Sequence, residues 1–240
     1  MGFFGLFGKG APTQKQIDKQ VTHLKEQYAK PEYRQMAMDK LLEWNTKECL
    51  AALLNRFKVV VQSPYWDEKE KRWVVDQLVE RGSVAREALE DFILKEDQIT
   101  YAIAAYRRIS LEEELIALLR KALEMRLPED YRSSASKVEL IAALEEYDSS
   151  DLSELLIPYL VDHHDDVQCL TLDVVARKKS ERAYPSLLSM LEEESHSARV
   201  LRHTALKVAE LELLIPENLS LAPEIQEDYV IKAGKLTTRR

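Results

Sequence analysis

Apolar residues recur every three or four positions along most of the chain, the spacing that places them on one face of an α-helix. The first such set consists of Ile17, Val21, Leu24 and Tyr28. Thr13 and Gln16 have the spacing of a capping box, in which each side chain satisfies a free backbone group at a helix start. The pattern therefore predicts a first helix that begins just after Thr13.

The same pattern continues in short blocks, separated by residues that start or stop helices. Pro31 suits the first turn of a second helix, because the N–H that proline lacks is unpaired there in any case. Asn45 is expected to end that helix, and Thr46 to cap a third one. The apolar positions of these two helices are Met36, Ala37, Leu41, Trp44, Leu50, Leu53, Leu54 and Phe57.

Later blocks repeat this arrangement. Ser63 and Pro64 break the pattern, Asp67 with Glu70 predicts a helix start, and Gly82 predicts the helix end. Residues 84–94 form the partner helix. Similar starts are predicted by Ser110 with Glu113, by Ser136 with Glu139 and by Asp151 with Glu154.

The first helices of successive pairs are expected to begin near residues 31, 67, 97, 134, 165 and 197. Steps of about 30 to 37 residues are typical of repeat proteins, whose short helix pairs bury their apolar faces by stacking on their neighbours. Residues 167–176 align without gaps with residues 200–209 and share Val, Thr, Val and Ala at matching positions. We therefore predict an all-α fold, a right-handed α-solenoid of about six short antiparallel helix pairs.

Two junctions between these pairs resemble those of HEAT-repeat proteins, an armadillo-like class of α-solenoid. In residues 155–167 a leucine-rich helix that contains Pro158 leads into an acidic turn, and Val167 then opens the next repeat. Residues 183–191 followed by 197–200 are similar. The family usually has an arginine beside the valine; Gln168 stands there in the first junction, while Arg199 and Arg202 lie near the valine of the second. The resemblance implies a solenoid that binds other proteins on its concave face, as a scaffold or adaptor.

On that interpretation the second helix of each pair lines the concave face and supplies the binding residues. The candidates are Asn55, Arg56, Lys58, Arg120 and Lys121. Trp66, in the loop expected after Pro64, is a further candidate because aromatic residues dominate interaction hot spots. An ordinary packing role is the alternative for this tryptophan.

The two ends of the chain depart from the repeats, so we divide it into an N-terminal segment (1–12), the repeats (13–215) and a C-terminal cap (216–240). The first segment carries four large apolar residues among glycines, namely Phe3, Phe4, Leu6 and Phe7. These side chains would fold back on the first helices, fill a groove of a partner protein, or contact a membrane surface peripherally. Residues 228–238 contain an Ala-Gly turn between short extended segments, which predicts a small hairpin.

The net charge of −8 is unevenly distributed, with +4 on residues 1–62 and −12 on residues 63–240. An acidic body disfavours nucleic acid as a partner, since affinity for nucleic acid depends on neutralising phosphates. The resemblance also brings two enzyme classes as alternatives, the alkylpurine DNA glycosylases and the bilin lyases. A glycosylase would need a basic groove, so we favour a protein partner.

Candidate catalytic chemistry is sparse. The sequence contains no phosphate-binding loop, nucleophile elbow or zinc-protease motif, so we favour a non-catalytic protein without cofactor or metal. Residues 162–166, Asp-His-His-Asp-Asp, are the densest run of potential metal ligands, but adjacent loop side chains seldom converge on one ion. We interpret them as an acidic turn in which Asp165 or Asp166 caps the next helix.

Two further features concern the cellular compartment. Cys49 and Cys169 lie within apolar helical patterns, so we expect them to be buried, reduced thiols. The sequence shows no secretory signal and no apolar run of membrane-spanning length. We therefore expect the protein to act in the cytoplasm.

Overall fold

The computed structural model describes residues 11–147, 152–193 and 195–239. The chain divides into two compact units, residues 1–115 and 116–240. Both units consist of short helices, and one two-stranded sheet near the C-terminus is the only sheet among the described residues. The prediction of an all-α fold with a small C-terminal hairpin is confirmed.

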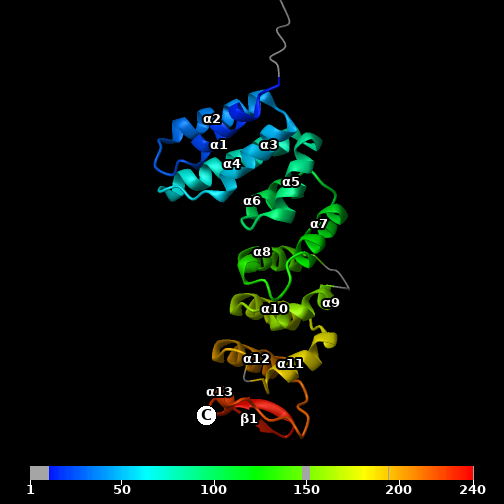
Figure 1. Ribbon diagram of the computed structural model, residues 1–240. Coiled ribbons are helices and arrows are strands. Elements are labelled where there is room, and N and C mark those ends of the chain that lie inside the picture. The colour runs from blue at the N-terminus through cyan, green and yellow to red at the C-terminus, as the bar shows by residue number, and fades with distance from the viewer. Residues whose placement is uncertain (1–10, 148–151, 194, 240) are drawn as a thin grey trace, which may run out of the picture. The chain divides into compact units, whose positions relative to one another are not determined.

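From residue 11 onward, where the structure describes it, the first unit contains six α-helices and the start of a seventh; Figure 1 shows their arrangement. A short 3₁₀ helix, η1, continues α3. The elements are α1 (Gln14–Lys25), α2 (Pro31–Trp44), α3 (Lys47–Leu53), η1 (Leu54–Lys58), α4 (Pro64–Arg81), α5 (Ser83–Lys95), α6 (Thr100–Arg107) and α7 (Glu112–Glu124), the last of which crosses into the second unit.

The second unit has the same style of short helices, several of them extended by a 3₁₀ turn, and it ends in the hairpin. Its elements after α7 are η2 (Tyr131–Ser133), α8 (Ser134–Glu145), α9 (Leu152–Leu156), η3 (Ile157–Val161), α10 (Asp165–Arg177), η4 (Glu181–Ala183), α11 (Tyr184–Met190), α12 (Ala198–Glu210), α13 (Pro223–Gln226), β1 (Tyr229–Lys232) and β2 (Lys235–Thr238).

Several predicted helix ends are confirmed. The side chain of Gln16 accepts a hydrogen bond from the Thr13 N–H at 2.8 Å, which is one half of the capping box. Pro31 occupies the first turn of α2, and Asn45 ends that helix in the left-handed conformation with φ 49°. Thr46 caps α3, where its hydroxyl accepts the N–H of Cys49 at 3.3 Å. These signals act over three or four residues, which is why the sequence alone reveals them.

Other predicted starts are wrong. Helix α4 begins at Pro64 and not at Asp67, so the Asp67 carboxylate lies inside the helix and is available for other partners. The N-terminus of α7 is stabilised by Glu114, whose carboxylate accepts the Leu111 N–H at 2.9 Å, and Glu113 does not take this part. In α8 the helix begins at Ser134, two residues before the predicted cap.

The start of α10 also differs from the prediction that Asp165 or Asp166 caps it. The cap is His164, whose Nδ1 accepts the N–H of Asp166 at 3.2 Å. Both aspartates instead lie in the first turn, where a negative charge is favoured by the helix dipole. Asp151, the predicted start of α9, lies outside the described residues.

Two residues that the periodicity places on buried faces are exposed. Helix α1 ends at Lys25, so Tyr28 leaves the helical face and is 86% exposed. Met36 is exposed on α2, and its neighbours Ala37 and Met38 fill the core in its place.

Within each unit, alternate helices pack on one another. In the first unit α3 contacts α5, and α4 contacts α6; in the second unit α8 contacts α10, which contacts α12 (Figure 1). Aliphatic side chains such as Leu53, Leu89 and Leu172 fill these contacts and have no exposed surface. Within the described residues, no helix combines the length and the apolar character needed to cross a membrane.

The hairpin at the C-terminus pairs Lys232 with Lys235 across a two-residue turn. Both turn residues have positive φ, 49° at Ala233 and 73° at Gly234. This is the conformation of the tight hairpin turns that match the twist of the flanking strands, for which Asn-Gly is the preferred sequence. The Gly234 carbonyl also accepts the Ile215 N–H at 2.8 Å, which ties the turn to the chain after α12.

The turn conformation leads to a prediction about two substitutions. Ala233→Asn should stabilise the hairpin by about 0.5–1 kcal/mol, because asparagine tolerates the left-handed conformation better than alanine. Gly234→Ala should destabilise it by about 1 kcal/mol, because only glycine adopts this φ without strain. Hydrogen exchange of the β1 and β2 amides measures both effects. Faster exchange in the asparagine variant, or unchanged exchange in the alanine variant, would contradict the assignment of the turn.

Candidate interaction surface

A buried ion pair joins α2 to α4 in the first unit. Arg34 on α2 is 2% exposed, and Glu70 on α4 is 4% exposed. The guanidinium donates two hydrogen bonds to the carboxylate, from Nε to Oε2 at 2.9 Å and from Nη2 to Oε1 at 2.8 Å. This two-bond arrangement is the strongest geometry available to an arginine and a carboxylate.

Arg56 brings η1 into the same network. Its side chain has no exposed surface, and its Nε donates to Glu70 Oε2 at 2.7 Å. Its Nη1 donates to the carbonyl of Val59 at 2.8 Å, and its Nη2 donates to Asp67 Oδ1 at 2.8 Å. The Glu70 carboxylate therefore accepts hydrogen bonds from two buried guanidinium groups, so its single negative charge is shared between Arg34 and Arg56.

Asp67 completes the network from the first turn of α4. Its Oδ2 accepts from Lys71 Nζ at 2.6 Å, and its Oδ1 accepts from the backbone N–H of Val61 at 3.0 Å. Burial opposes ionisation of this carboxyl, but the hydrogen bonds from Lys71 and Arg56 outweigh it and lower the pKa of Asp67. Asp67 is therefore charged at neutral pH.

The network fixes two loops beside one another. Besides binding Glu70, Arg34 donates through Nη1 to the backbone carbonyls of Ala29 at 2.7 Å and Glu26 at 3.2 Å, in the loop between α1 and α2. Arg56 and Asp67 hold the backbone of residues 59–61, which lead into α4. Because the buried bonds satisfy backbone groups of both loops, the surface above them is held in a defined shape.

That surface carries a group of partly and fully exposed residues, three of them aromatic, which we call the Trp66 surface. It consists of Tyr28, Pro31, Tyr65, Trp66 and Lys69. Trp66 is half-buried, whereas Tyr28 and Tyr65 are exposed. The rings of Tyr65 and Trp66 pack edge to face with centroids 5.3 Å apart, and Lys69 Nζ lies 4.6 Å from the centre of the Trp66 ring.

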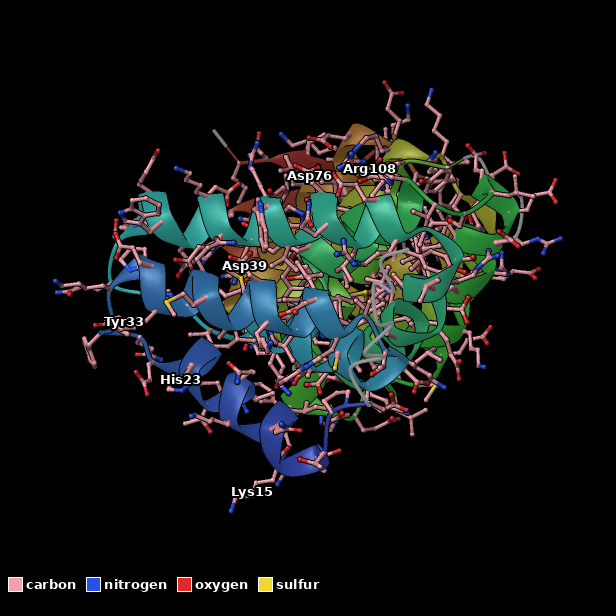
Figure 2. All side chains as sticks on the ribbon, turned by 90° about the horizontal axis from the view of Figure 1, so that it is seen from above. Lys15, His23, Tyr33, Asp39, Asp76 and Arg108 are labelled. Carbon is pink, nitrogen blue, oxygen red and sulfur yellow. The ribbon has the colours of Figure 1, made fainter. Side chains whose placement is uncertain are left out.

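A cavity of about 230 Å³ opens in this surface between the two fixed loops. Tyr28 and Pro31 line it from one side, Val61 and Trp66 from the other, and Arg34 lies among the lining residues. In Figure 1 the loop before α2 and the start of α4 lie at the same end of the first unit. Figure 2 shows Tyr33 projecting from the start of α2 at that end, and this tyrosine is 60% exposed.

Such an arrangement suits protein recognition. Tyrosine and tryptophan provide large contact areas at small cost in side-chain entropy, and they are enriched where binding energy is concentrated. The charged groups beneath the surface are paired with one another. The cavity above them combines the rings of Tyr28 and Trp66 with Pro31 and with polar side chains that can hydrogen-bond to a partner, namely Gln27, Gln62 and Ser63.

The residues predicted to form a concave binding face are placed differently. Arg56 is fully buried in the ion network, so it has no surface to offer a partner. Asn55 is half-buried and donates to the Ala52 carbonyl at 3.0 Å, while Lys58 is paired with Glu96 at 2.8 Å. The helical periodicity misplaces Arg56 because the chain changes from α to 3₁₀ geometry at Leu54, which rotates later side chains relative to an α-helix.

The other predicted contacts are not brought together with these. Arg120 is half-buried and Lys121 is exposed, and both lie on the part of α7 that belongs to the second unit. Phe3, Phe4, Leu6 and Phe7 lie outside the described residues. Trp66 lies in the first turn of α4 and not in the expected loop, and it lines a cavity together with the exposed ring of Tyr28.

The acidic turn at residues 162–166 serves the structure of the second unit. Asp162 is buried and pairs with Lys137, which also has no exposed side-chain surface. The second oxygen of Asp162 accepts the N–H of His164 at 2.9 Å, and His164 in turn caps α10. Among the described residues, no group of three or more His, Cys, Asp and Glu side chains is placed to hold a metal ion.

The two cysteines are buried and not joined in a disulfide, which confirms the expectation of buried thiols. Burial raises the pKa of the Cys169 thiol, so it stays protonated near neutral pH. Its nucleophilic form is therefore scarce, and we assign it a packing role.

Comparison of the chain with protein-family models, with curated proteins and with solved structures finds no match. The assignment of a function therefore depends on the geometry of the two units alone.

Proposed function

We propose that this protein is a non-catalytic scaffold or adaptor that binds another protein, and that the Trp66 surface is one of its contacts. The observation that carries the proposal is an exposed aromatic surface around a cavity, built directly over a buried, fully bonded ion network. A surface that is already ordered loses little further entropy on binding. Because it is ordered before binding, the Trp66 surface is better suited to recognition than a single exposed aromatic residue.

The architecture that we propose for the whole chain is a HEAT-like α-solenoid. Support comes from the contacts between alternate helices within each unit and from helix pairs that begin about 30–37 residues apart. The free, buried thiols support our proposal that the protein acts in a reducing compartment such as the cytoplasm. The N-terminal Phe-rich segment remains a proposed second contact, with a partner protein or a membrane surface.

Replacing Trp66 by alanine should weaken binding of the partner at least about tenfold. The expected loss follows from the cost of truncating a hot-spot tryptophan, about 2 kcal/mol or more, with 1.4 kcal/mol corresponding to a factor of ten. A photoreactive phenylalanine analogue at position 65 first captures the partner, because the Tyr65 side chain stands at the rim of the surface. The affinity of the purified partner for both chains is then measured calorimetrically.

Tyr131→Ala provides the control, since Tyr131 is an exposed aromatic residue of the second unit. Circular dichroism of both variants verifies that they remain folded. The proposal predicts that Trp66→Ala weakens binding and Tyr131→Ala does not. Equal affinities of the Trp66→Ala variant and the unchanged chain would show that the partner binds elsewhere.

A further inference from the structure

A second cavity lies in the second unit, where the turn before α10 meets the turn before α12. It has a volume of about 580 Å³, and its lining includes Asp165, Gln168, Glu193 and His196. Helices α10 and α12 pack on one another, so the two turns are held side by side. The Trp66 surface belongs to the other unit and contributes nothing to this cavity.

The hydrogen bonds around His196 determine which ring nitrogen carries the proton. The side-chain amide of Gln168 donates through Nε2 to the carbonyl of Asp162, which leaves its Oε1 facing His196 Nδ1 at 2.9 Å. An amide oxygen can only accept, so Nδ1 must be the donor. In the neutral imidazole the other nitrogen, Nε2, then has a free lone pair.

This lone pair is buried and unused. His196 is 8% exposed, and its Nε2 has no hydrogen-bond partner among the described residues. A carboxylate oxygen of Glu193, Oε2, lies 3.4 Å away but not in hydrogen-bonding geometry. Two acceptors that face each other in this way repel unless a donor lies between them, and a buried polar atom without a partner is costly.

The remaining lining favours a cationic donor. Asp165 adds a second carboxylate, whose Oδ2 accepts from the hydroxyl of Ser197 at 2.6 Å. No lysine or arginine is among the described residues that line the cavity. A helix N-terminus favours an anion, but the N-termini of α10 and α12 do not remove the preference of the cavity for a cation. Their free N–H groups are already capped by His164 and Ser197.

We propose that this cavity, the His196 pocket, binds an arginine side chain of a protein partner. A guanidinium group is planar and presents five N–H donors, so it can donate to His196 Nε2 and to the Glu193 carboxylate together. Both bonds are assisted by charge, and the volume of the pocket exceeds what one such side chain needs. The inference deepens the proposed function, since it names the chemistry of a second contact, but it is tested without the partner.

The test is a titration of the full chain with N-acetyl-arginine methylamide, followed by nitrogen-15 NMR of the histidine rings. We expect saturable binding in the millimolar range and a shift of the His196 Nε2 resonance, with little change at His203. The citrulline analogue has the same shape without the charge and should bind at least tenfold more weakly. An imidazole of His196 that carries both protons at pH 7.5, or equal binding of the two compounds, would overturn the proposal.

Two variants complete the test. Glu193→Gln should weaken arginine binding at least tenfold, whereas Glu192→Gln should leave it unchanged, because Glu192 lies outside the pocket and accepts the Ser220 N–H. One-to-one binding of Zn²⁺ without binding of the arginine compound would reassign the pocket to a metal ion and overturn the inference. If the arginine compound binds but no protein is captured at position 65, the proposed function fails and this inference stands. If a protein is captured but the arginine compound does not bind, the inference fails and the proposed function stands.

Discussion

The Glu70→Gln variant is expected to lose about 3–5 kcal/mol of the free energy of unfolding, the usual cost of removing one partner from a buried ion pair. Glutamine has the size of glutamate but not its charge, so the change leaves Arg34 and Arg56 buried with a single remaining carboxylate, that of Asp67. Neither guanidinium can release its proton to relieve the imbalance. A loss of this size is a large fraction of the stability of an ordinary domain.

Urea denaturation followed by tryptophan fluorescence measures this effect directly. All three tryptophans, Trp44, Trp66 and Trp73, belong to the first unit, so the signal reports on that unit. Glu80→Gln on the same helix is the matched control, because Glu80 is exposed and should change stability by less than about 0.5 kcal/mol. Similar stabilities of the two variants would show that the buried network contributes little.

We expect a comparable loss, about 3 kcal/mol or more, when Lys137 is replaced by methionine in the second unit. Lys137 and Asp162 have no exposed side-chain surface, and the ammonium also donates to the Leu127 carbonyl at 3.2 Å. Methionine fills a similar volume but leaves the Asp162 carboxylate buried without its cation. The exposed Lys121 provides the control, since Lys121→Met removes the same charge from the surface.

The pairing itself is tested by removing both charges. The double variant with Lys137→Met and Asp162→Asn should recover at least about 1 kcal/mol relative to Lys137→Met alone, because asparagine can still accept the His164 N–H without a buried charge. Urea denaturation followed by circular dichroism gives the comparison. If the two changes add without any recovery, the two side chains do not interact as the structure shows.

The sequence reveals those parts of the fold that depend on neighbouring residues. Helix ends at Pro31, Asn45 and Gly82 and the Ala233–Gly234 turn follow from backbone preferences over a few positions, and all four are confirmed. The spacing of apolar residues likewise reveals the helices themselves. These signals require no knowledge of which segments meet in space.

The ion network could not be predicted in this way. Arg34 and Glu70 are separated by 36 positions, and only the packing of α2, η1 and α4 brings them together. Asp67 resembles a helix cap in sequence, yet α4 starts three residues earlier and turns it toward Arg56. The one available signal is that charged residues in the first two turns of α4, such as Glu70 and Lys71, share a helix face with the apolar residues Val74, Val75 and Leu78.

The two candidate surfaces differ for a similar reason. Trp66 could be predicted as a contact from the sequence, because it follows Pro64 and Tyr65 and aromatic residues are enriched at interaction sites. The cavity beside it depends on Tyr28, whose exposure results from the end of α1 at Lys25. His196 gives no sequence signal at all, since its free nitrogen follows from the orientation of Gln168.

The central claim, that a protein partner docks on the Trp66 surface, is tested most directly by hydrogen–deuterium exchange of the full chain with and without the partner captured at position 65. The account predicts slower exchange in residues 26–33 and 59–69, the two loops and helix starts that form the surface. A duplex DNA with an alkylated purine, measured in parallel, should protect neither segment. Protection confined to other segments, or protection by the DNA, would contradict the account.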